Sequence, residues 1–243
     1  MTFNIAAGHG DLVAIANVIR ASSSDVVALQ EVDVRWAARS NFVDQASTLA
    51  EQLGMQVRFA PIYQIRSSDA PTLSREYGVA LLSKFPIVAF TNHKLTRLST
   101  QQVDAVPALA PGLLDATVNA RGMHIRVFNT HLDYRADPAV RKQQVTEMLT
   151  IIGAPIAPTL LFGDLNAAPL APELAPLFSR LRDSWPASGD AGLTYPATEP
   201  VKRIDYVLVS SHFRVTAASV PVTSVSDHRP LIVDLVVSGV SRP

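Results

Sequence analysis

The sequence predicts an α/β fold in which two mixed β-sheets pack face to face and helices cover their outer sides. Short apolar runs, typical of buried strands, alternate with segments of helical periodicity. Several of these runs are close enough along the chain to form hairpins. The 243 residues, 48% hydrophobic and 17% charged, suffice for one large buried core. No stretch has the composition of a linker, so we expect residues 1–243 to form a single domain.

The N-terminal half is predicted to contain two helices among apolar strands. The first helix begins after Asp11, a residue type that favours the N-cap position. The second extends from about Phe42 to Leu53 and ends at Gly54, which suits the left-handed position after a helix. The strands predicted in this half are residues 2–5, 25–29, 78–83 and 87–91.

The C-terminal half begins with a predicted hairpin of residues 113–118 and 124–129. A helix is predicted after Pro138, because apolar residues recur there at the spacing of one helical face; these are Val145, Met148, Leu149 and Ile152. Later strands are predicted at residues 159–162, 204–209, 213–222 and 231–237. Long surface loops are predicted at residues 61–75, 98–111 and 185–200, and loops of this length are often functional.

Composition excludes some classes of protein and disfavours others. Acidic and basic residues both number 21, so the net charge is zero, whereas proteins that bind long nucleic acids usually carry a basic excess. Cysteine is absent, which excludes disulfides, zinc–thiolate sites and thiol nucleophiles. No apolar run is long enough to span a membrane. The N-terminus lacks the pattern of a signal peptide, so we expect a cytoplasmic protein unless the N-terminus has been trimmed.

Six short motifs follow one another along the chain, each at the end of an apolar run and each carrying carboxylate, amide or imidazole groups. They are Asn4, Leu29-Gln30-Glu31-Val32, Asn129-Thr130-His131-Leu132, Gly163-Asp164-Leu165-Asn166, Ile204-Asp205-Tyr206 and Ser226-Asp227-His228-Arg229-Pro230. In this order, and over most of the chain, the set resembles the endonuclease/exonuclease/phosphatase superfamily. The resemblance implies a four-layer α/β sandwich and a phosphoesterase that depends on Mg²⁺, with Mn²⁺ as a substitute.

Glu31 is the predicted metal ligand. It follows a strand too apolar to hold an unpaired charge, so it either emerges at the strand end or binds a cation. Mg²⁺ prefers oxygen ligands and often takes only one or two protein carboxylates, and we favour the metal. The resemblance implies that Asn4 orients Glu31 or contacts the water shell of the metal, and that Asp227 lies near it. Many nucleases of the superfamily have Asp or Asn where this chain has Ala6, which disfavours a two-metal mechanism and DNA repair.

Asp164 and Asn166 form the most specific motif. Gly163 is expected to let the backbone bend sharply after the strand. An isolated Asp-x-Asn usually forms an Asx turn. The resemblance implies instead that Asp164 orients or deprotonates the attacking water, while Asn166 holds the geometry and binds the phosphate.

Asp205 and His228 form a second group of candidate residues. A carboxylate bonded to one imidazole nitrogen fixes the tautomer and raises the basicity of the other nitrogen. The alternative is a buried structural His–Asp pair. The resemblance implies that Asp205 orients His228, that His228 acts on the phosphate or the water, and that His131 stabilises the pentavalent phosphorus. Whether Asp164 or His228 is the general base stays open.

The sequence therefore predicts in-line attack of water on a phosphoester. The zero net charge favours a small or lipid-derived phosphoester over nucleic acid, and we expect a monomer. One alternative is an endonuclease or exonuclease with a locally basic cleft, and a weaker one is a non-catalytic binding module. Arg66 and Arg75, in a predicted loop, could contact a second charged group of the substrate, although an exposed surface role is favoured for loop arginines.

Overall fold

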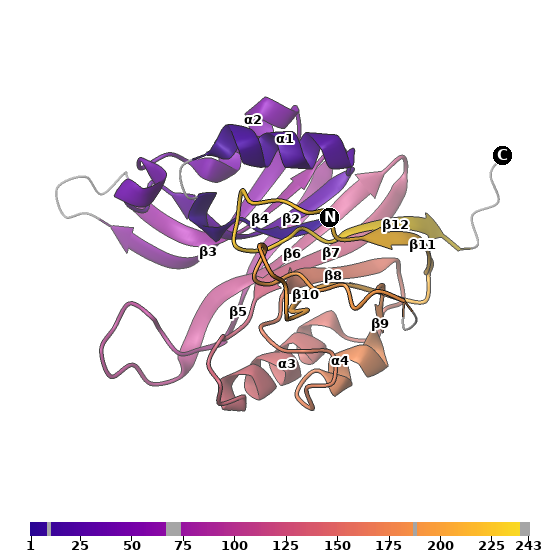
Figure 1. The fold of residues 1–243 in the computed structure, drawn as a ribbon. Coiled ribbons are helices and arrows are strands. Elements are labelled where there is room, and N and C mark those ends of the chain that lie inside the picture. Colours follow the sequence, from indigo (N-terminus) through magenta and orange to yellow (C-terminus); the bar gives the residue numbers. More distant parts are fainter. Residues whose placement is uncertain (9–10, 67–73, 187–188, 239–243) are drawn as a thin grey trace.

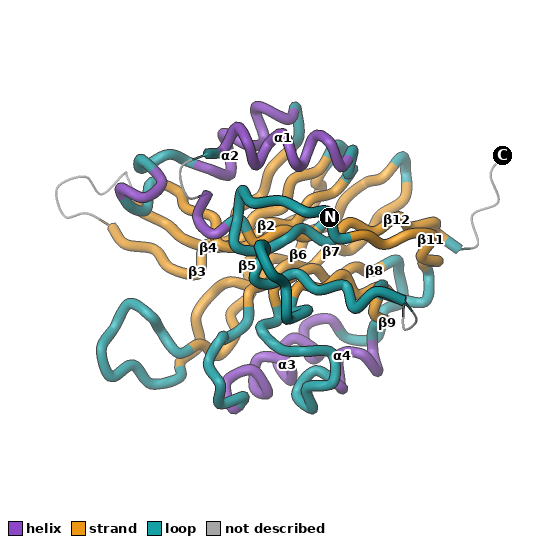
Figure 2. The backbone as a smooth tube through the Cα atoms, in the orientation of Figure 1, coloured by secondary structure: helices purple, strands orange, loops and turns teal. Residues whose placement is uncertain are grey.

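The computed structural model describes residues 1–8, 11–66, 74–186 and 189–238. Its two larger sheets pack face to face, and helices cover the outer side of each (Figure 1). This arrangement is the predicted four-layer α/β sandwich. Figure 2 shows the same chain coloured by secondary structure, with strands in the two inner layers and helices outside.

The first sheet contains four strands in the order β1–β2–β4–β3. Strands β1 and β2 are parallel, and the other neighbours are antiparallel. The strands are β1 (Thr2–Asn4), β2 (Val26–Val34), β3 (Gln56–Arg66) and β4 (Ser74–Ser83). Helices α1 (Leu12–Ser22) and α2 (Gln45–Leu53) cover the outer face of this sheet, and the short 3₁₀ helices η1 (Ala6–Gly8) and η2 (Ala38–Ser40) lie in its connections (Figure 1).

The second sheet contains six strands in the order β5–β6–β7–β8–β10–β9. They are β5 (Ile87–Arg97), β6 (Ala108–Ala120), β7 (Met123–His131), β8 (Thr159–Asp164), β9 (Arg182–Asp183) and β10 (Asp205–Val209). Helices α3 (Ala139–Ile152) and α4 (Ala175–Arg180) cover its outer face (Figure 1). A separate antiparallel pair is formed by β11 (Phe213–Ser219) and β12 (Ile232–Val237).

Apolar side chains fill all three interfaces between the four layers. Those between the sheets come from alternate positions of facing strands, as the period of a strand requires. They include Ala28, Ala60, Val79 and Leu81 from the first sheet and Leu114, Ala116, Val127, Phe162 and Val207 from the second. Two further clusters join the first sheet to α1 and α2 and the second sheet to α3 and α4. The ends of the central strands are thus held by packing on both faces.

The predicted helix ends are largely confirmed. Asp11 caps α1 by accepting a hydrogen bond of 2.8 Å from the N–H of Ala14. Gly54 ends α2 in the left-handed conformation, with φ of 64°. The start of α2 was predicted at Phe42 but lies at Gln45, because Asp44 supplies the N-cap acceptor.

Two of the three predicted loops are wrong in part. Residues 61–66 belong to β3 and residues 74–75 to β4, while residues 67–73 lie outside the described residues. The loop was predicted at Pro61 because proline usually interrupts strands. In this fold β3 is an edge strand and its register shifts after Pro61, so the proline is tolerated. Likewise, residues 108–111 extend β6. The third predicted loop, 185–200, contains no helix or strand in its described parts.

Within the described part of the chain, no helix combines the length and the apolar character that crossing a membrane requires.

Candidate active site

Three of the predicted catalytic residues occupy matching positions on neighbouring strands of the second sheet. Asp164 ends β8 and is in register with His131, which ends the parallel strand β7. On its other side Asp164 is in register with Asp205, the first residue of the antiparallel strand β10. Side chains at paired positions of adjacent strands lie on the same face of a sheet. The strand register therefore brings these three side chains together at one edge.

Gly163 does not form the predicted bend. It lies inside β8, directly before Asp164. A Cβ atom at this position would lie 2.4 Å from the carbonyl oxygen of Thr130 on β7. The glycine is therefore required by the close approach of β7 and β8, and it sets the spacing between His131 and Asp164.

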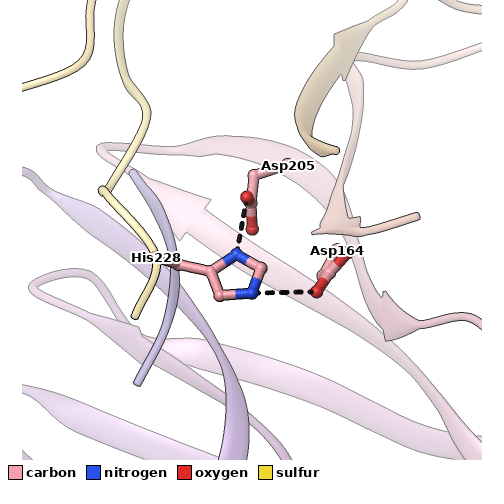
Figure 3. A group of neighbouring side chains, drawn as sticks. All are labelled: Asp164, Asp205 and His228. Carbon is pink, nitrogen blue, oxygen red and sulfur yellow. Dashed lines mark hydrogen bonds and ion pairs between the residues drawn. The ribbon is translucent and has the colours of Figure 1, made fainter. Parts of the chain in front are cut away.

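His228 joins two of these carboxylates from a separate segment before β12 (Figure 3). Its Nδ1 lies 2.9 Å from Oδ2 of Asp205, and its Nε2 lies 3.7 Å from Oδ2 of Asp164. The same oxygen of Asp164 lies 3.5 Å from Nε2 of His131. Asp205 is fully buried and His228 nearly so, with 0% and 4% exposure. The predicted Asp205–His228 pair is thus formed, and two imidazoles converge on one oxygen of Asp164.

The electrostatics of this group favour a charged His228 and raise the proton affinity of Asp164. Burial opposes charge on His228, but the nearby carboxylates of Asp205, Asp164 and Asp227 raise its pKa to about 10. Burial and repulsion from Asp205 raise the pKa of Asp164 to about 6, although His131 and His228 act in the opposite direction.

Glu31 lies in a β-bulge rather than at a strand end. Strand β2 continues to Val34, and its register against β4 shifts between Leu29 and Val32. Glu31 has a positive φ of 54°, a conformation that is uncommon for a residue other than glycine. The bulge turns the side chain of Glu31 into the pocket that also contains Asp164. The predicted strand end was wrong because a bulge interrupts pairing without ending the strand.

Asn4 connects the two carboxylates. Its Nδ2 donates hydrogen bonds of 3.0 Å to Oε1 of Glu31 and 3.1 Å to Oδ2 of Asp164. Its Oδ1 accepts from the backbone N–H of Ala6. Since the amide oxygen already has a partner, this geometry suits the orienting role for Asn4 better than direct coordination of a metal.

Asn166 forms the Asx turn that an isolated Asp-x-Asn motif predicts. Its backbone N–H donates to Oδ1 of Asp164 at 2.9 Å, which is the hydrogen bond of an Asx turn. Its φ is 51°, and its Nδ2 donates to the carbonyl of Leu132. Asn166 therefore fixes Oδ1 of Asp164, while Oδ2 accepts from Asn4 and faces His131 and His228. A contact between Asn166 and phosphate stays a prediction.

A pocket of about 400 Å³ opens over these groups. The predicted site residues that line it are Glu31, His131, Asp164, Asn166, Asp227 and His228. Asn4 and Asp205 are fully buried and lie outside this lining, where they contact Glu31, Asp164 and His228. The structure thus separates the predicted residues into a lining set and a supporting pair.

The donor atoms in the pocket fit a hard divalent cation. Glu31, Asp164 and Asp227 bring three carboxylates into one pocket, and no salt bridge to Lys or Arg compensates any of them within the described residues. All three offer oxygen ligands, which Mg²⁺ prefers. Asp164, Asp205 and His228 also offer ligand atoms within 4.8 Å of one another. In that second group, however, Nδ1 of His228 is already engaged by Asp205.

Sequence reasoning missed two residues that fix the segments beneath the site: Asn129 joins the two sheets, and Ser226 ties the segment before β12 to β1. Nδ2 of Asn129, on β7, donates to the carbonyls of Leu29 and Ala80 in the first sheet, and its Oδ1 accepts from Gln30 at 2.7 Å. Ser226 donates to the carbonyl of Asn4 at 2.7 Å. Asn129 and Ser226 both belong to the quoted motifs, and for Asn129 the available signal was an amide at the end of a largely apolar buried run.

Comparison with known proteins agrees with this fold. The sequence profile of the Endonuclease/Exonuclease/phosphatase family matches residues 1–228. The chain therefore belongs to this family, whose members are typically metal-dependent hydrolases of phosphoesters.

Individual relatives resemble the chain to different extents. An endonuclease/exonuclease/phosphatase structure from Beutenbergia cavernae is 25% identical, with a TM-score of 0.73 over 98% of this chain and 71% of that one. A mannosyl-6-phosphatase from Bacteroides thetaiotaomicron is 19% identical, with a TM-score of 0.66 over 97% and 98%, and shows the fold alone. Protein cwh43 of Schizosaccharomyces pombe is 30% identical over 195 residues, which are 79% of this chain but only 18% of that protein.

Proposed function

We propose that this protein is a Mg²⁺-dependent phosphoester hydrolase in which Asp164 activates the attacking water. The observation that carries the proposal is the convergence on Oδ2 of Asp164, which lies within 3.1 to 3.7 Å of Asn4, His131 and His228. Two imidazoles and a carboxylate around one pocket provide donors for a phosphate and an acceptor for a water proton.

Glu31 and Asp227 would hold the metal, and Asn4 would keep Glu31 in place. A bound Mg²⁺ would neutralise a phosphate oxygen and stabilise the leaving alkoxide. The bulge in β2 supports this assignment. It directs Glu31 into the pocket and requires Glu31 to adopt an unfavourable positive φ. Mn²⁺ would substitute for Mg²⁺, since it also accepts oxygen ligands.

The charges favour Asp164 over His228 as the general base. A histidine with a pKa of about 10 is protonated near neutral pH and donates hydrogen bonds instead of accepting a proton. Asp164, with a pKa raised to about 6, is mostly ionised at neutral pH and is a stronger base than an ordinary aspartate. His228, held by Asp205, and His131 would then stabilise negative charge on the phosphorane.

The size and charge of the site favour a small or lipid-derived phosphoester. A pocket of about 400 Å³ is within the usual range for small ligands. The chain carries no net charge to attract a long polyanion. A nuclease is the second candidate, because the pocket wall also contains the cations Arg97, Arg135 and Lys202. A non-catalytic role fits poorly with a complete set of paired catalytic groups.

The direct test is hydrolysis of a chromogenic phosphodiester and the matching monoester, with excess chelator and after adding back Mg²⁺ or Mn²⁺. We expect turnover of at least one ester only with a divalent ion. Asp164→Asn should reduce turnover by roughly 10²–10⁴-fold, the scale of a lost general base. Asp137→Asn, a change at an exposed position outside the pocket, should leave turnover unchanged. Full activity in chelator, or in Asp164→Asn, would overturn the mechanism.

A further inference from the structure

Arg97, the last residue of β5, places a buried guanidinium in the wall of the active-site pocket. Its Nε, Nη1 and Nη2 donate to the carbonyls of Pro111, His131 and Gly112, at 3.0, 2.9 and 3.0 Å. No salt bridge among the described residues involves Arg97. A guanidinium has five N–H donors, so these three hydrogen bonds leave two donors without an acceptor in the part of the chain that the structure describes.

A buried cation without a carboxylate partner is unusual. Transfer of an unpaired charge from water to the protein interior is unfavourable, and backbone carbonyls compensate only part of that loss. Burial lowers the pKa of Arg97 to about 10, so the guanidinium remains charged near neutral pH. The carboxylates of Asp133 and Glu147 favour this charge from nearby, but within the described residues neither forms a salt bridge with Arg97. The pocket wall therefore contains a buried positive charge that no described carboxylate contacts directly.

Gln144, on α3, adds an unused donor to the same wall. The side chain is fully buried, and its Oε1 accepts from the backbone N–H of Asp133 at 3.0 Å. Its Nε2 has no hydrogen-bond partner among the residues described. Arg97 donates to the carbonyl of His131, and Gln144 accepts from the N–H of Asp133. Since His131 and Asp133 are two residues apart, both side chains flank one short segment of the pocket wall.

Of the other cations considered for this pocket, Lys202 lines it but is exposed, with its Nζ over the ring of Tyr195. Arg135 pairs with Asp133 and donates to the carbonyl of Leu98. Arg66 and Arg75, considered from the sequence as contacts for a second charged group, are exposed and do not line the pocket. Arg97 is thus the buried cation best placed to act on a ligand in the pocket.

We propose that the wall formed by Arg97 and Gln144 binds a second anionic group of the substrate, a phosphate or a carboxylate, while the scissile phosphate lies against Asp164 and His228. This subsite deepens the proposed function and rests on it. Arg97 would supply the charge and uncommitted N–H groups, and Gln144 its free amide. The preferred substrates would then be compact phosphoesters with two anionic groups.

Binding can be measured by calorimetry with matched ligands in the presence of Mg²⁺, on the Asp164→Asn background so that the esters are not turned over during the titration. Ethanediol to hexanediol bisphosphates are compared with alkyl monophosphates of the same chain length, and phosphorylated hydroxy acids provide the carboxylate arm. We expect at least one bisphosphate or phosphocarboxylate to bind roughly tenfold more tightly than its monophosphate counterpart, in line with one additional charge-assisted interaction. The series that binds more tightly, the bisphosphates or the phosphorylated hydroxy acids, identifies the second anion as phosphate or carboxylate. Equal affinity across every matched pair would overturn the proposal.

Gln144→Glu is the sharpest variant, because it keeps an oxygen for the N–H of Asp133 and replaces the free donor with a negative charge. The affinity ratio between dianionic and monoanionic ligands should fall toward one. Gln52→Glu makes the same change at an exposed position on α2 and should keep the ratio of the unmodified protein. An undiminished ratio in Gln144→Glu would contradict the subsite.

This experiment separates the subsite from the hydrolase proposal. Selective binding of dianionic ligands without hydrolysis of any phosphoester would refute the hydrolase and support the anion subsite. Metal-dependent hydrolysis without discrimination between matched ligands would support the hydrolase and refute the subsite.

Discussion

Asn4 and Asp164, which are 160 positions apart in the sequence, are joined by a hydrogen bond of 3.1 Å between Nδ2 and Oδ2. Asn4 ends β1 in the first sheet, and Asp164 ends β8 in the second. The same amide nitrogen donates to Glu31. One side chain thus links the two sheets and couples the proposed metal ligand to the proposed base, so that neither carboxylate is positioned independently of the other.

The first prediction concerns metal binding. Glu31→Gln keeps the shape of the side chain and an oxygen acceptor for Asn4 but removes the charge. We expect affinity for Mn²⁺ to fall by at least about tenfold, because even loss of an outer partner of a metal ligand has effects of about 10–100-fold. Mn²⁺ binding can be followed by electron paramagnetic resonance without any substrate.

Glu51→Gln is the matched control for that measurement, because Glu51 is exposed on α2, away from the pocket. It should bind Mn²⁺ as the unmodified protein does. Unchanged Mn²⁺ affinity in Glu31→Gln would show that Glu31 is not a ligand and would turn attention to the group of Asp164, Asp205 and His228.

The second prediction distinguishes cooperation from independent action in the Asp205–His228 pair. The 2.9 Å contact between them predicts that Asp205 acts through His228. Asp205→Ala and His228→Ala should each lower turnover by roughly 10²–10⁴-fold, and the double variant should be little worse than His228→Ala alone. The measurement is a double-mutant cycle on kcat, with folding checked by circular dichroism. Multiplicative losses would mean that the two residues act separately.

Much of the site could be predicted because its residues interrupt apolar strands. A carboxylate, amide or imidazole at the end of a buried run needs a partner or a function, and this applied to Asp164, Asp205, His131 and His228. The helix ends at Asp11 and Gly54 depend on local signals and were predicted correctly. These features depend on a few neighbouring residues and on the period of one element.

The features that depend on contacts between distant segments could not be predicted. The bulge at Glu31 is defined by the register of β2 against β4. Glycine is required at position 163 because the carbonyl of Thr130, on another strand, leaves no room for a Cβ atom. Arg97 ends a half-exposed strand and gave no signal, since its burial results from β6 and β7 folding over it. Pairing across sheets is a tertiary property, which short sequence windows do not contain.

The third prediction is a pH dependence of stability in the metal-free protein. The pKa of His228 is raised from 6.5 to about 10 on folding, so its stabilising contribution is fully present below about pH 6.5 and is lost as pH rises through about 10. The free energy of unfolding, measured with urea in excess chelator, should therefore fall between pH 7 and pH 10. His228→Asn should show a smaller fall.

The imidazole of His228 provides a second readout. Its NMR signals should remain those of the protonated ring near neutral pH in the metal-free protein and titrate only at markedly alkaline pH. Titration near the ordinary histidine pKa would contradict the charged state assigned to His228 and would restore it as a candidate base.

The last prediction concerns substrate class, and it rests on the difference between a compact pocket and a long charged groove. A nuclease neutralises several phosphates with Lys and Arg, and each neutralised phosphate steepens the loss of affinity with salt. Here the pocket is about 400 Å³, and its wall brings together Arg97, Arg135 and Lys202, of which Arg135 is already paired with Asp133. Few cations are thus available for a polyanion.

We therefore expect faster cleavage of small or lipid-derived phosphoesters than of nucleic acids. The measurement is kcat/KM with Mg²⁺ across plasmid, abasic oligonucleotide, RNA, sphingomyelin, glycerophosphodiesters and inositol phosphates, at low and high salt. The preferred substrate should lose little activity on raising salt, because a compact ligand displaces few counterions. Rapid cleavage of any nucleic acid, with a steep decline at high salt, would instead establish the nuclease and imply a basic path beyond the pocket.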